Sequence, residues 1–152
     1  MAIRITINHI KLVRESSHLY QIDHRSIHGP EDAVAVVNSV FSLKDEAQEV
    51  VCALYLTTAN AIAGIQEITR GTIDASIVNP REVFKAALLH NASSIILLHN
   101  HPSGDPDPSR ADIAVTERIS KSGKILDIPL LDHIIIGAGG TFRSLKAEGI
   151  VD

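Results

Sequence analysis

Aromatic residues and cysteine are scarce in this sequence. It contains no tryptophan, two tyrosines, three phenylalanines and a single cysteine, Cys52. One cysteine excludes an internal disulfide framework and fits a reducing compartment. Because Cys52 lies within the apolar run VVCALYL, we interpret it as a small buried hydrophobic residue rather than a reactive thiol. With so few aromatic side chains, the core has to be built mainly from Ile, Val, Leu and Ala.

Long hydrophobic runs are also missing. No stretch of the sequence approaches the roughly 20 apolar residues that a membrane-spanning helix requires. Residues 1–17 alternate between polar and apolar and carry charges, unlike the continuous apolar segment of a signal peptide. We therefore expect a soluble, cytoplasmic protein that has no membrane partner.

The sequence has no excess of positive charge. Its 14 Lys and Arg residues are outnumbered by 18 Asp and Glu residues, which gives a formal net charge of −4. Broad DNA binding needs a cationic surface, and single-strand binding commonly uses aromatic side chains as stacking platforms. The composition therefore does not support a nucleic-acid partner, although it leaves room for a local basic patch.

The length and composition predict one ordered domain with a short extension. The chain has 152 residues, of which 45% are apolar and 21% charged, and this is enough to bury a substantial core. An alternating segment, a polar turn and a second short apolar segment predict an N-terminal hairpin over residues 1–28, packed on the main domain. The main domain is predicted to span residues 29–152.

Helical and extended patterns alternate along the main domain. Apolar spacing and helix-end signals predict helices over residues 30–41, 80–91 and 109–123, the last of them ending at Gly123. Buried or alternating runs predict strands over residues 50–58, 61–69, 93–101, 130–137 and 141–145. A loop is predicted over residues 71–79. This order predicts an α/β or α+β fold with helices on the faces of a mixed sheet.

The segment IILLHNHPSGDPDPSRAD, residues 95–112, has the strongest functional signal. His99 and His101 end a predicted strand, and residues two apart on an extended chain point to the same face. Three prolines stiffen the loop that follows, and Asp112 falls in the first turn of the next predicted helix. Two imidazoles and a carboxylate suit Zn²⁺, and three protein ligands leave a fourth position for water, as in catalytic zinc sites.

A helix cap is the main alternative to a metal site in this segment. Ser109 and Asp112 fit the S-x-x-D pattern of a capping box, in which case the loop and the cap are structural. A calcium loop is excluded, because Arg110 and Thr116 stand where a loop that begins at Asp105 needs glycine and glutamate. From the residues alone, the metal site and the cap both stay open.

The string H-x-H-P-S-G-D-P-x-P-S-x-x-D, from His99 to Asp112, resembles the JAMM (MPN+) metal motif in its RadC-like (UPF0758) branch. The segments TRGTIDASIVNPREVFKAAL before it and LLDHIIIG after it are also similar to RadC proteins, so the resemblance covers roughly residues 30–148. It implies a JAB/MPN domain, a cytidine-deaminase-like α/β/α sandwich around a mixed, mostly antiparallel sheet. The resemblance also implies that His99, His101 and Asp112 bind one zinc ion per chain, and that Ser109 stabilises an oxyanion.

Glu49 is singled out by the same resemblance. It matches the glutamate that receives the proton of the attacking water and passes it to the leaving group. The residues alone leave Glu46, Glu67 and Glu82 as equal candidates for this role. The chain departs from the family in two respects. Asp74 stands where the family more often has asparagine, and full-length RadC proteins carry an N-terminal module that resembles a helix-hairpin-helix DNA binder where a short hairpin is predicted here. The association of that family with DNA repair therefore transfers poorly.

These observations predict a zinc-dependent hydrolase. The resemblance implies a JAMM-type metallopeptidase or isopeptidase whose substrate is a polypeptide or a ubiquitin-like protein. One alternative is a metal-dependent nuclease or DNA-associated RadC-type protein, but the acidic composition and the single metal position argue against it, because two-metal sites dominate phosphodiester chemistry. The other alternative is a non-catalytic interaction module, against which the complete ligand set argues. The oligomeric state stays open.

Overall fold

A computed structural model describes residues 25–71 and 78–151 of the chain. Most of the predicted N-terminal hairpin, residues 1–28, lies outside the described residues, as does most of the predicted loop 71–79. At the beginning of the described chain, Ser26 forms an isolated antiparallel bridge with Ala61. The predictions for those two segments therefore stay predictions.

A five-stranded sheet forms the centre of the molecule, with strand order β2-β1-β3-β4-β5. Its strands, which correspond to the five predicted ones, are β1 (Glu49–Leu56), β2 (Ile62–Gly71), β3 (Ser94–Asn100), β4 (Leu130–Ile136) and β5 (Phe142–Ser144). Strand β3 pairs parallel with β4, and the other neighbouring strands are antiparallel. The prediction of a mixed, mostly antiparallel sheet is confirmed.

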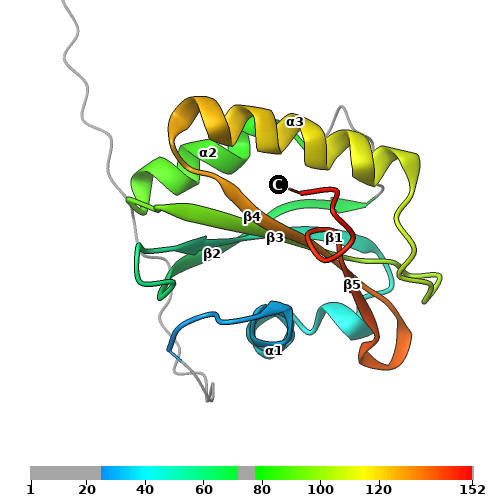
Figure 1. Cartoon of the computed structure of the whole chain (residues 1–152). Coiled ribbons are helices and arrows are strands. Elements are labelled where there is room, and N and C mark those ends of the chain that lie inside the picture. Colours follow the sequence, from blue (N-terminus) through cyan, green and yellow to red (C-terminus); the bar gives the residue numbers. More distant parts are fainter. Residues whose placement is uncertain (1–24, 72–77, 152) are drawn as a thin grey trace, which may run out of the picture.

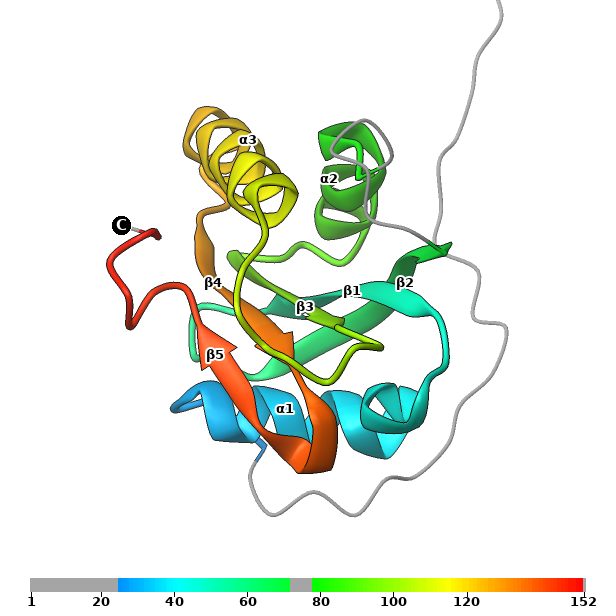
Figure 2. The ribbon, with the colours of Figure 1, turned by 90° about the vertical axis from the view of Figure 1, so that its right-hand side faces the viewer.

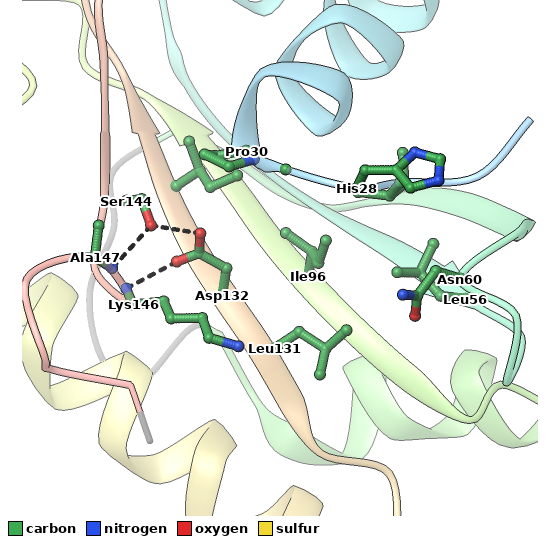
Figure 3. Close-up of a pocket in the computed structure, with 13 residues that line it drawn as sticks. His28, Pro30, Leu56, Asn60, Ile96, Leu131, Asp132, Ser144, Lys146 and Ala147 are labelled. Atoms are coloured by element: carbon green, nitrogen blue, oxygen red, sulfur yellow. Dashed lines mark hydrogen bonds between the residues drawn. The ribbon is translucent and has the colours of Figure 1, made fainter. Parts of the chain in front are cut away.

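Helices cover both faces of this sheet. Helix α1 (Pro30–Phe41) lies on one face, and α2 (Pro80–Leu89) and α3 (Arg110–Leu126) lie together on the other (Figures 1 and 2). The three layers confirm the predicted α/β/α sandwich. Helices α1 and α2 both begin with proline, as predicted, because a first-turn residue needs no backbone N–H donor. No helix in the described parts of the chain is long and apolar enough to cross a membrane.

The alternation of side chains along β1 divides the core into two halves. Val51 and Tyr55 belong to the half beneath α2 and α3, whereas Val50, Cys52 and Leu54 belong to the half beneath α1. A central strand buried on both faces is expected to have this continuous apolar sequence. Burial raises the pKa of the Cys52 thiol to about 12, which supports its interpretation as a buried hydrophobic residue.

The prediction that the third helix ends at Gly123 is wrong. Helix α3 continues to Leu126 and ends at Asp127, which has a left-handed φ of 54°. At Gly123 the chain that leads into β4 approaches the helix closely, because a Cβ on this glycine would lie 2.5 Å from the backbone oxygen of Ile128. Glycine is required here for that close approach and not for a turn.

Candidate metal site

The residues of the 99–112 motif gather where β3 ends and α3 begins. His99 is the penultimate residue of β3, His101 follows the strand, and Asp112 lies in the first turn of α3. His99 Nε2 lies 3.0 Å from His101 Nε2 and 3.2 Å from Asp112 Oδ1. The structure therefore brings the three predicted metal ligands together.

Strand β1 brings Glu49 to the same point from a distant part of the sequence. Strands β1 and β3 are antiparallel with Val51 opposite His99, so Glu49, two residues earlier, comes opposite His101. Glu49 Oε1 lies 3.8 Å from His101 Nε2. Together Glu49, His99, His101 and Asp112 form a group that could hold a metal ion, with one ligand atom from each lying within 4.8 Å of the others.

The three competing glutamates are engaged elsewhere. Glu46 and Glu67 both form ion pairs with Arg70, at 2.7 and 2.8 Å. Glu82 forms an ion pair with Lys85 on the exposed surface of α2. The geometry therefore distinguishes Glu49 from the glutamates that the sequence left as equal candidates.

Asn100, between the two histidines, fixes β1 against β3 at this edge of the sheet. Its Oδ1 accepts a hydrogen bond from Val50 N at 2.8 Å, and its Nδ2 donates to the backbone oxygens of Glu46 and Gln48 at 3.2 and 2.9 Å. The side chain is buried, and its three bonds hold the backbone on both sides of Glu49. This role was not predicted from the sequence, because an asparagine between two predicted metal ligands has no pattern of its own.

The turn after β4 holds the loop that links His101 to α3. His101 N donates to Ile136 O, and Ala138 N, in the short 3₁₀ helix η2 (Ala138–Gly140), donates to Gly104 O, both at 2.9 Å. Gly104 has a φ of +85°, and a Cβ on it would lie 2.8 Å from the Cβ of Ala138. The loop is therefore held through backbone contacts that require glycine at this position.

The two carboxylate oxygens of Asp112 serve different purposes. Oδ2 accepts a hydrogen bond from Ser109 N at 2.6 Å, and Ser109 Oγ accepts one from Asp112 N at 3.2 Å, which completes the predicted capping box. Oδ1 is buried and has no hydrogen-bond partner among the residues that the structure describes. The cap and the metal site are therefore compatible, because each uses a different oxygen.

Asp112 is ionised at neutral pH. Burial raises the pKa of this carboxyl, but the neighbouring His99 and the hydrogen bonds with Ser109 outweigh burial and hold the pKa well below its usual range. Its Oδ1 lies 3.2 Å from His99 Nε2, and a buried, ionised oxygen is costly unless that nitrogen donates a proton to it or a metal cation compensates it. Asp112 Oδ1 therefore fits a metal ligand better than a purely structural cap.

Each histidine of the site has a second contact on its Nδ1 side. His101 Nδ1 lies 2.7 Å from the backbone oxygen of Asp105, and His99 Nδ1 lies 2.8 Å from Nε2 of His133, a fully buried residue of β4. Burial, with a smaller contribution from His99, lowers the pKa of His133 well below its ordinary value, so its ring is neutral at pH 7. His133 was not predicted to belong to the site, although a histidine within the apolar run LLDHIIIG is a buried polar group that requires a partner.

The donor set fits a divalent metal ion. Two imidazole nitrogens and one carboxylate oxygen face one another, and the lone pairs of such atoms repel one another unless a proton or a metal cation lies between them. Nitrogen and oxygen ligands of this kind are used by Zn²⁺ and by other first-row transition metals. The residues present therefore fit a metal site, and their chemistry leaves the identity of the metal open.

Comparisons with known proteins agree with this geometry. A family model described as a RadC-like JAB domain matches residues 27–150. The chain is 45% identical to a UPF0758 protein of Methanosarcina acetivorans over 141 residues. This alignment covers 93% of this chain and 60% of that protein. It is 47% identical to a UPF0758 protein of Halalkalibacterium halodurans over 140 residues, in an alignment that covers 92% of this chain and 59% of that protein.

The chain spans about 60% of the length of the curated relatives that it matches. The UPF0758 name of these relatives specifies no activity. The JAB domain and the group of Glu49, His99, His101 and Asp112 together fit a metal-dependent hydrolase.

Proposed function

The chain belongs to the RadC-like JAB domain family, and from this premise we propose that it is a zinc-dependent hydrolase that cleaves a peptide or isopeptide bond in a polypeptide substrate. The observation that carries the proposal is the buried Oδ1 of Asp112, which faces the Nε2 atom of His99 and has no hydrogen-bond partner in the described part of the chain. A cavity of about 340 Å³ beside Glu49 and Pro102 leaves room for a substrate.

His99, His101 and Asp112 would hold the metal ion in this proposal. When bound, zinc supplies a Lewis acid that polarises a carbonyl group and lowers the pKa of water to about 7. The remaining acid of the group, Glu49, is then available for proton transfer. Hydrogen bonds from Asn100 to the chain before β1 and from Val50 to Asn100 keep the Glu49 backbone in place.

Glu49 is proposed to move the proton. Its side chain is half-buried, with 20% of its surface exposed, and it lies 3.8 Å from His101 Nε2. The carboxylate takes a proton from water as the water oxygen bonds to the substrate carbonyl carbon. It then gives that proton to the leaving nitrogen as the C–N bond breaks, which balances the reaction and regenerates the base.

Ser109 is proposed to stabilise the negative charge that develops on the carbonyl oxygen. Its Oγ accepts a hydrogen bond from Asp112 N, and this leaves the hydroxyl proton able to donate. Donors of this kind act most strongly in the transition state, where the oxygen carries its charge.

The first test is the metal content of the purified protein. We expect elemental analysis to find about one zinc per chain in the wild type, in line with three protein ligands, and none in His101→Ala. His28→Ala is the matched control, because His28 is exposed and pairs with Asp32 away from the site, so this variant should retain the metal.

A wild-type protein that binds no zinc even after reconstitution would refute the proposal and make the loop and cap structural. If the protein binds zinc, assays with different substrates then identify the reaction that it catalyses. Cleavage of peptides or isopeptides that is lost in His101→Ala would support amide hydrolysis. Nicking of plasmid DNA with the same dependence on His101 would instead favour a metal-dependent nuclease.

Two substitutions of Ser109 separate catalysis from helix capping. Alanine at an N-cap costs about 1 kcal/mol of stability, whereas glycine costs only a few tenths. Since both remove the hydroxyl, we expect both variants to lower kcat about 10²–10³-fold, although only Ser109→Ala should lower the melting temperature appreciably. If Ser109→Gly keeps the wild-type kcat on a peptide that the wild type cleaves, the role of Ser109 is confined to the cap.

A further inference from the structure

A chain of buried hydrogen bonds runs behind His99, on the side away from the proposed metal position. His99 Nδ1 lies 2.8 Å from His133 Nε2, and His133 Nδ1 lies 2.6 Å from Thr116 Oγ1. Thr116 Oγ1 in turn donates to the backbone oxygen of Asp112 at 2.6 Å. The side chains of His99, Thr116 and His133 are fully buried, so water does not compete for these bonds.

Two neighbouring elements bring these groups together. Strands β3 and β4 pair parallel with Leu97 opposite His133, so the His133 and His99 rings lie on the same face of adjacent strands. Thr116 lies one helical turn after Asp112 in α3 and faces the same side. The contacts therefore depend on the packing of α3 against β4, which no local sequence pattern specifies.

A charge on the fully buried ring of His133 would be costly, so this ring carries a single proton. With that single proton, one order of donors satisfies all three contacts. The carbonyl oxygen of Asp112 has no proton, so the Thr116 hydroxyl must donate to it. Because that hydroxyl has a single proton, its oxygen accepts from His133 Nδ1–H. The neutral ring of His133 then has a lone pair on Nε2, and His99 Nδ1–H donates to it.

We propose that Thr116 and His133 are positioning residues that fix the tautomer of His99 and leave a lone pair on its Nε2. That nitrogen faces Asp112 Oδ1, and with its lone pair already in place the ring does not have to change tautomer when it binds a metal ion. The backbone oxygen of Asp105 fixes His101 in the same way, through its contact with Nδ1. The consequence for metal affinity rests on the proposed function, whereas the tautomer itself is a property of the metal-free protein.

The sharpest test compares two substitutions of Thr116 in the full chain. Thr116→Val removes the hydroxyl with little change of shape, so His133 Nδ1–H loses its acceptor and the ring is free to protonate on Nε2. That proton would force His99 to carry its own proton on Nε2. Thr116→Ser keeps the hydroxyl and is the matched control. We expect zinc affinity, measured by competition with a chromophoric chelator, to fall about 10–100-fold in Thr116→Val and to stay at the wild-type value in Thr116→Ser.

Long-range ¹H–¹⁵N correlation spectra of the metal-free protein provide a second measurement. We expect the proton of His99 on Nδ1 in the wild type and in Thr116→Ser, and on Nε2 in Thr116→Val. A wild-type protein with this proton on Nε2 would overturn the proposal, as would equal zinc affinities of the valine and serine variants. If Thr116→Val does not fold, the wild-type spectrum alone decides.

The two proposals fail in distinguishable ways. A wild-type protein that binds no zinc but carries the His99 proton on Nδ1 would refute the hydrolase while supporting the fixed tautomer. A wild-type protein that binds zinc but carries this proton on Nε2 would support the metal site and overturn the role of Thr116 and His133.

Discussion

Replacement of Glu49 by glutamine is expected to lower kcat about 10²–10⁴-fold while the protein keeps its metal. Glutamine has nearly the same shape as glutamate but cannot take a proton from water at neutral pH. The substitution leaves His99, His101 and Asp112 unchanged, so the atoms proposed to hold the ion stay in place. The measurement is kcat on a peptide or isopeptide that the wild type cleaves, together with the zinc content of the same preparation.

Glu46→Gln is the control for this experiment. Glu46 lies three residues before Glu49 and pairs with Arg70 at the surface, and an exposed pair of this kind contributes at most about 1 kcal/mol. The Glu46 variant should therefore keep its activity. A Glu49→Gln protein with zinc bound and wild-type kcat would show that another group moves the proton. Loss of zinc from that variant would instead make Glu49 a metal ligand.

Substitution of Gly123 by alanine is expected to destabilise the fold by about 2 kcal/mol. Two opposing effects decide this value. Alanine in the middle of a helix gains about 1 kcal/mol over glycine, and overpacking costs up to about 3 kcal/mol. The added Cβ would lie 2.5 Å from the backbone oxygen of Ile128. Because that backbone leads directly into β4, it cannot move without disturbing the sheet, so the cost of overpacking outweighs the gain.

Thermal unfolding measures the effect of this substitution. For a chain of this size, 2 kcal/mol corresponds to a fall of about 4–8 °C in the melting temperature. Lys121→Ala is the control on the same helix, because Lys121 is exposed and its loss should change stability by no more than about 0.5 kcal/mol. A melting temperature of Gly123→Ala at or above the wild-type value would contradict the close approach of α3 to Ile128.

The fold was largely predictable because its strands have strong local signals. The run VVCALYL is apolar at every position, and a strand buried on both faces needs this pattern. The error at Gly123 has a physical cause, since glycine both ends helices and permits close backbone contacts. The sequence shows the residue but does not show what will approach it. Only the packing of α3 against the segment before β4 distinguishes the two uses.

The site was likewise predictable from local signals only where its residues lie close together in the sequence. His99, His101 and Asp112 fall within 14 consecutive residues, so spacing and local structure were sufficient to group them. Glu49 was chosen by resemblance, because the antiparallel pairing of β1 with β3 cannot be derived from either strand alone. His133 was missed because its contact with His99 depends on the order of strands in the sheet.

The pairing of β1 with β3 also protects the site against errors of assembly. Side chains of a strand alternate between its two faces, so a slip of one residue would turn Glu49 away from His101. The same slip would exchange the two core halves, so that Val50, Cys52 and Leu54 would take the places of Val51, Ala53 and Tyr55 beneath α2 and α3. Side chains of the wrong size in a packed core cost about 1–3 kcal/mol. A misfolded chain with a displaced acid is therefore unstable as a whole. The register that packs the hydrophobic core correctly is therefore the same register that places Glu49 beside His101.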